Sequence, residues 1–131
     1  MKTLRAFRGA TQLTADDSLE MRGAVVELLE EILHANQIAN EDLISILFTA
    51  TSDLKSEFPA VGVRMYGIND VPLICAQEIE VVNALPRVIR ILIHAQSKLS
   101  RAEIAHKYLR GAQVLRPDLE EVSAPKDGEL N

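Results

Sequence analysis

One apolar segment constrains the fold of this chain more than any other. It spans residues 87–94, is rich in β-branched residues and carries a single charge in its interior, Arg90. A continuous apolar run of this kind is typical of a strand that is covered on both faces. Because a chain of 131 residues has few helices to cover two faces of a sheet, we expect neighbouring subunits to cover one of them.

Four other segments have the pattern of short strands. They cover residues 4–8, 43–51, 71–76 and 113–115. The first alternates apolar and basic residues, which is the period-two pattern of a strand, and we expect Gly9 to end it. The second is a bounded run of apolar and β-branched residues that is too short to favour a helix.

Three segments are predicted to be helical. They cover residues 16–35, 58–66 and 100–111. The long first helix has apolar residues every three or four positions, and Thr14 is its expected N-cap. Pro59 fits the first turn of the second helix, and a capping box that begins at Ser100 predicts the third. Gly67 and Gly111 are expected to end these two short helices.

Strands that alternate with one long and two short helices predict an α+β fold, in which a mixed β-sheet has its helices packed on one face. No linker, repeat or low-complexity segment divides the chain, so residues 1–119 are expected to form a single domain. Residues 120–131 are polar and acidic and contain Pro and Gly, and we expect them to form a mobile tail.

The composition excludes several classes of function. Lys and Arg total 14 against 19 Asp and Glu, a formal net charge of −5 that argues against nucleic acids or anionic membranes as partners. No stretch approaches the roughly 18 apolar residues of a membrane span and no secretion signal is visible, so we expect a cytoplasmic protein. The single cysteine, Cys75, excludes an intrachain disulfide, and the three His are not spaced as metal ligands. A small-molecule site or a protein interface remains.

Charged residues within or beside apolar strands are the main candidates for a functional site. Arg8 belongs to the first strand, Glu78 follows the third, and Arg90 lies within the fourth. A charge that is buried in a strand has to be paired. Two interpretations stay open: a cross-strand ion pair between Arg90 and Glu78 that is only structural, or a cluster of arginines that holds a dicarboxylate, with Glu78 accepting a hydroxyl hydrogen bond.

A set of motifs follows one another along the chain in a specific order. They are Arg8-Gly9-Ala10-Thr11, Ala50-Thr51-Ser52-Asp53-Leu54, Phe58-Pro59-Ala60, Val71-Pro72, Cys75-Ala76-Gln77-Glu78, Arg87-Val88-Ile89-Arg90, Tyr108-Leu109 and Leu115-Arg116-Pro117-Asp118-Leu119. From about residue 4 to 119, this ordered set resembles the AroH class of monofunctional bacterial chorismate mutases. The resemblance implies a homotrimer that forms a pseudo α/β-barrel, with active sites in the clefts between subunits. It also implies the Claisen rearrangement of chorismate to prephenate, a shikimate-pathway step toward phenylalanine and tyrosine, with no cofactor or metal.

The resemblance also assigns roles to individual residues. Arg90 would be the cation beside the breaking ether oxygen and a substrate carboxylate, and Arg8 a second carboxylate ligand. Glu78 and Cys75 would meet the ring hydroxyl, and Tyr108 would bond the enolpyruvyl carboxylate. The expected walls of the site are Phe58, Ala60, Leu73, Ile74 and Leu115, and the expected cations at its mouth are Arg64 and Arg116. Val61 and Ile74 stand where the family commonly has Lys and Thr, so no lysine contact is expected at the mouth.

The absence of acid-base, nucleophilic and metal motifs fits this reaction, because a pericyclic rearrangement moves no proton. A protein can accelerate it by confining the flexible substrate and by placing a fixed positive charge where the ether oxygen gains electron density. Two other classes of function stay open. One is a reactive-enamine deaminase, because small trimers of similar architecture also bind a carboxylate through Arg. The other is a non-catalytic protein that binds an anionic metabolite.

Overall fold

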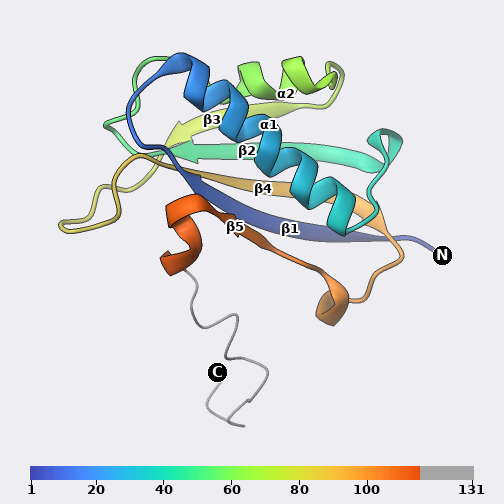
Figure 1. Ribbon diagram of the computed structural model, residues 1–131. Coiled ribbons are helices and arrows are strands. Elements are labelled where there is room, and N and C mark those ends of the chain that lie inside the picture. Colours follow the sequence, from blue (N-terminus) through green and yellow to red (C-terminus); the bar gives the residue numbers. More distant parts are fainter. Residues whose placement is uncertain (116–131) are drawn as a thin grey trace, which may run out of the picture.

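The computed structural model describes residues 1–115; the expected tail and Arg116 lie outside this range. Within it, five strands form one sheet in the order β3-β2-β4-β1-β5 (Figure 1). The strands are β1 (Thr3–Gln12), β2 (Leu43–Ala50), β3 (Leu73–Gln77), β4 (Val88–Ser97) and β5 (Lys107–Leu109). Strand β4 is central and pairs antiparallel with β1 and β2, whereas β3 and β5 join the two edges in parallel pairs. The expected mixed sheet is confirmed.

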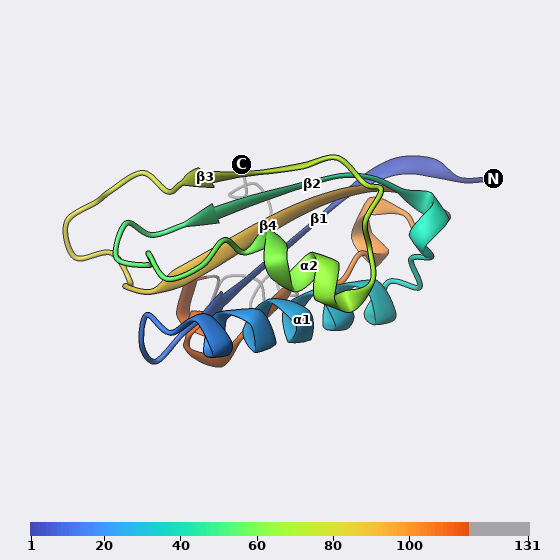
Figure 2. The same ribbon diagram turned by 90° about the horizontal axis from the view of Figure 1, so that it is seen from above.

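Two α-helices, α1 (Ser18–Ala35) and α2 (Ala60–Tyr66), cover the same face of the sheet, as the view from above shows (Figure 2). The apolar side of α1 packs on Phe7, Phe48 and the buried isoleucines of β4 to form the core. Gly67 ends α2 in the left-handed conformation, as expected. No helix among residues 1–115 is long and apolar enough to cross a membrane.

The opposite face of the sheet carries no α-helix; only the 3-10 helix η3 (Arg110–Leu115) packs on one end of it, against Ala10 and Val88. Along β4, Ile89, Ile91 and Ile93 are buried toward α1, while Arg90, Leu92, His94 and Gln96 on the opposite face are only partly buried. Apolar side chains on this open face include Leu4 and Ile74, which are 53% and 66% exposed. Exposed apolar surface on a sheet face is a feature of subunit interfaces. Coverage of this face by neighbouring subunits, which the apolar pattern of residues 87–94 predicts, stays a prediction.

Strand β1 is longer than the predicted 4–8 segment, because Gly9 lies inside it and does not end it. A Cβ atom at Gly9 would lie 2.7 Å from the Lys107 carbonyl oxygen and 2.8 Å from Cδ1 of Ile32. The glycine therefore allows α1 and β5 to approach the strand closely. The start of α1 also differs from the prediction: Asp17 is the N-cap and accepts from the backbone N–H of Glu20, while Thr14 bonds to the Glu20 side chain.

The predicted helix over 100–111 and strand over 113–115 are both wrong. The capping box of Ser100 and Glu103 is present, but it begins only the short 3-10 helix η2 (Arg101–Glu103). The chain then extends into β5, which pairs with β1, and turns into a second 3-10 helix, η3 (Arg110–Leu115). Pairing with the sheet edge thus overrides the local helical pattern.

Candidate active site

Three of the predicted site residues meet at one hollow on the open face. Arg8 from β1, Arg90 from β4 and Tyr108 from β5 line a hollow of about 200 Å³. The register explains their meeting, because Ala10 of β1 pairs with Arg90 on one side and with Tyr108 on the other. Leu47, Thr49 and Leu92 complete the floor. Two arginines and a tyrosine thus line one small volume, which suits an anionic ligand.

Arg90 is held by an ion pair with Glu78. Nε of Arg90 lies 2.9 Å from Oε1 of Glu78, the residue that directly follows the end of β3. The ion pair is therefore present, as the structural interpretation of the sequence expected. It does not fill the hollow, and because it uses Nε, the terminal nitrogens of the guanidinium provide further donors. The structural and the ligand-binding interpretations are thus compatible.

These charges are not buried in the single chain, contrary to the picture of charges enclosed within apolar strands. The side chain of Arg90 is 41% exposed and that of Glu78 16% exposed, and Arg8 is exposed. The reason is that β4 and β1 present alternate residues to the face that no α-helix covers. Only a further layer over this face could exclude water from the two arginines.

A second hollow, of about 460 Å³, lies at the other edge of the sheet. Phe58, Pro59 and Cys75 are among its lining residues. Partial burial raises the pKa of the Cys75 thiol above its ordinary value, and the backbone N–H of Ala60 and the charge of Arg64 offset only part of this increase. At neutral pH Cys75 is therefore a neutral thiol that can donate a weak hydrogen bond, not a nucleophile.

The other predicted wall residues are divided between these regions. Leu73 belongs to β3 and packs on the main core, and Ile74 lies on the open face of the same strand, in register with Leu47. Ala60 is buried at the start of α2. Leu115 ends η3 and packs with Tyr108 on a small cluster around Ala10, Val88 and Ala112.

Sequence reasoning missed His106, which contacts the site through the backbone. Its Nδ1 accepts a hydrogen bond of 3.0 Å from the backbone N–H of Arg8, and burial lowers the pKa of the imidazole. As one of three scattered histidines it gave no signal, because the pairing of β5 with β1 brings it beside Arg8. The floor residue Thr49 was detectable in principle, since it occupies an alternate position in the predicted 43–51 strand.

A single chain does not bring all the predicted residues together. Cys75 is paired in register with Phe48 and so lies on the helix-covered side, whereas Tyr108 is on the open side. Strands β3 and β5 are also opposite edges of the sheet, four interstrand steps or about 19 Å apart. One small ligand therefore cannot contact both hollows of a single chain.

Comparison with known proteins identifies a family whose members match the chain over nearly its full described length. The family model described as chorismate mutase type I matches residues 4–119. The chorismate mutase AroH of Thermus thermophilus is 42% identical over 118 residues, covering 89% of this chain and 97% of that protein. The chorismate mutase AroH of Bacillus subtilis is 38% identical over 128 residues, covering 97% and 98%. The structure of a chorismate mutase from Clostridium thermocellum superposes with a TM-score of 0.83 at 36% identity, covering 84% and 98% of the two chains.

Proposed function

The chain belongs to the type I chorismate mutase family, and from this premise we propose that it assembles complete active sites only between neighbouring subunits of a homotrimer. The protein is an isomerase that rearranges chorismate. The observation that carries the proposal is the separation of the predicted residues into two hollows on opposite faces of one chain. One subunit supplies Arg8, Arg90 and Tyr108, and its neighbour supplies the hollow of Phe58 and Cys75.

The open face of the sheet supports assembly. It carries exposed apolar side chains such as Leu4 and Ile74, together with the exposed Arg8 and the partly exposed Arg90. Burial of this face would remove apolar surface from water at about 25 cal/mol per Å², which is the usual driving force for association. The number of subunits, three, comes from the resemblance to the AroH class.

In the proposed site, Arg90 stabilises the negative charge that develops on the ether oxygen as the C–O bond breaks and the new C–C bond forms. Arg8 and Tyr108 bind the two carboxylates of the substrate, and so restrict its flexible arm to the reactive geometry. Glu78 keeps Arg90 in place through the 2.9 Å contact and accepts a hydrogen bond from the ring hydroxyl. No step requires a proton to move, which agrees with the neutral state of the Cys75 thiol.

Closure of the interface has a direct electrostatic consequence. An arginine that is 41% exposed in the single chain interacts with an oxygen through a high dielectric, and its effect on a transition state is weak. A neighbouring subunit over the open face removes water and strengthens the same interaction without moving the guanidinium. Assembly and catalysis are therefore coupled in this proposal.

Dilution tests this coupling. We expect the purified protein to consume chorismate in the presence of a metal chelator, with specific activity falling as the protein is diluted into the range where subunits dissociate. Loss of the ultraviolet absorbance of chorismate measures the rate, and sedimentation at the same concentrations measures the assembly. A monomer as active as the assembled form would contradict the shared site, and a protein without turnover in any assembly state would contradict the assignment of the reaction.

A further inference from the structure

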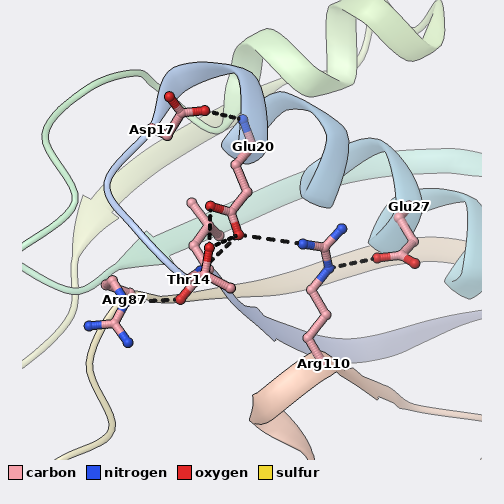
Figure 3. A network of polar contacts seen from close by, with 7 residues as sticks. Thr14, Asp17, Glu20, Glu27, Arg87 and Arg110 are labelled. Atoms are coloured by element: carbon pink, nitrogen blue, oxygen red, sulfur yellow. Dashed lines mark hydrogen bonds and ion pairs between the residues drawn. The ribbon is translucent and has the colours of Figure 1, made fainter.

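Arg110 forms a bridge between the C-terminal part of the described chain and the long helix. Its Nε lies 3.0 Å from Oε1 of Glu27, and Nη1 lies 3.6 Å from Oε2 of Glu20. Figure 3 shows the guanidinium pointing from the end of β5 toward α1, between the two carboxylates. Glu20 and Glu27 are seven residues apart, so they lie on the same side of the helix, two turns from each other. We call these three residues the Arg110 clamp.

One end of the clamp is already fixed before Arg110 binds to it. Oε2 of Glu20 accepts a 2.7 Å hydrogen bond from the backbone N–H of Thr14, and the Thr14 hydroxyl also contacts this carboxylate. The bond from the Thr14 N–H is the main cause that holds the pKa of Glu20 below its ordinary value. Glu20 is thus an ionised, oriented acceptor, with a side chain only 19% exposed. Arg110 therefore binds to a Glu20 side chain that Thr14 already orders, which reduces the entropy cost of forming the clamp.

The segment held by the clamp is short and lies at the edge of the sheet. Strand β5 has three residues and forms one edge of the sheet, paired only with β1 among the described strands. Arg110 itself has a φ of 55°, a left-handed backbone conformation that disfavours residues other than glycine. Beyond it, Ala112 is buried against Ala10 and Val88, with Tyr108 and Leu115 packed around them. Arg110 therefore lies at the turn between two residues of the proposed site.

We propose that Arg110 is a positioning residue: through Glu20 and Glu27 it holds the turn between β5 and η3, and so keeps Tyr108 at the hollow it shares with Arg8 and Arg90. The inference rests on the proposed role of Tyr108 in binding substrate. Its physical basis is that the two ion pairs reduce the fraying of a short edge strand and offset the free-energy cost of the left-handed conformation at Arg110. Arg110 acts through Tyr108 and does not touch the substrate.

The direct test replaces Arg110 with Gln, which has the same cost in a left-handed turn but lacks the charge. We expect amide hydrogen exchange over residues 107–115 to become about two- to fivefold faster and the KM for chorismate to rise by a similar factor, with kcat nearly unchanged. Arg110→Lys keeps the charge and should recover most of the wild-type KM. Lys2→Gln is the matched control, because it removes a 2.9 Å ion pair to Asp42 elsewhere on the chain, and it should change neither quantity.

A double-mutant cycle with Tyr108→Phe separates positioning from general stability. If Arg110 acts through the Tyr108 hydroxyl, the fold-increase in KM of the double variant should be smaller than the product of the fold-increases of the two single variants. Fully multiplicative effects, or unchanged exchange over residues 107–115 in Arg110→Gln, would overturn the positioning role while leaving the proposed site intact. A Tyr108→Phe variant with wild-type KM would overturn the role of Tyr108 and the inference together.

Discussion

At the scale of single residues, the proposed chemistry depends on one guanidinium. Arg90 stands on the open face of the central strand, lies 2.9 Å from the Glu78 carboxylate through Nε, and lines the same hollow as Arg8 and Tyr108. The sequence alone makes this residue a candidate, because a charge inside a β-branched run has to be paired. It could not show that the ion pair and the hollow coexist, since that depends on which nitrogen meets Glu78.

Substitution of Arg90 tests the electrostatic role. We expect Arg90→Ala to lower kcat by at least about 10²- to 10³-fold, because it removes a preorganised donor at the oxygen that gains charge. Citrulline at the same position retains the shape and most hydrogen bonds without the charge, and should lose nearly as much. Initial rates of chorismate consumption measure both. A citrulline variant close to wild type would show that shape, and not charge, drives the reaction.

At the scale of elements, predictability followed the strength of the local pattern. The helix α1 and the strands β2 and β4 have long periodic or continuous apolar runs, and the expected and observed residues agree within a few positions. Residues 100–115 have a helical pattern, but their conformation is decided by pairing with β1, a partner about 100 residues away in sequence. Sequence signals of local range cannot report such pairing. The prediction that Gly9 ends the first strand was wrong for the same reason, because this glycine is needed for close contact with α1 and β5.

The contact between α1 and α2 predicts opposite effects for two helical glycines. A Cβ atom at Gly62 would lie 2.6 Å from Cβ of Val25, whereas one at Gly23 would meet nothing within 4 Å. Gly62→Ala should therefore lower the free energy of unfolding by about 1–3 kcal/mol through overpacking. Gly23→Ala, the matched control, should raise it by about 0.5–1 kcal/mol through helix propensity. Urea unfolding measures both, and equal effects would contradict the observed packing of the two helices.

The hydrogen bond between His106 and the backbone of Arg8 predicts a pH dependence of stability. Nδ1 can accept this bond only when it carries no proton, and burial lowers the pKa of His106 in the folded state from 6.5. Just below pH 6.5 the unfolded chain therefore binds more protons than the folded chain. The contribution of His106 to the free energy of unfolding is thus full above this pH and is lost as the pH falls. Glu20 and Glu57, whose pKa values are lowered from 4.5, titrate at more acidic pH.

The measurement is the urea midpoint at pH 7.5 and pH 5.5. We expect the wild type to lose more stability between these values than His106→Gln, in which an amide oxygen can accept the same bond at either pH. Equal losses in the two proteins would show that the bond to Arg8 does not depend on the protonation of His106.

At the scale of the whole molecule, one sequence pattern indicated that the chain's own helices do not cover both faces of the sheet. The apolar run over 87–94 predicted two covered faces, and the α-helices of the structure cover only one (Figure 2). The distribution of the predicted site residues over two hollows could not be predicted, because strand order and side-chain direction are needed to separate Cys75 from Tyr108. The expected cytoplasmic location stays a prediction, and Arg116 lies outside the described residues.

The most direct test of a site shared between subunits is complementation between two inactive variants. Arg90→Ala disables one partial site, and Cys75→Trp fills the hollow of the other. When the two chains are co-expressed with different tags and hybrids are purified, each hybrid trimer should contain one interface with both partial sites intact, and so regain about one third of the wild-type activity. Hybrids that assemble but stay as inactive as their parents would contradict the shared site.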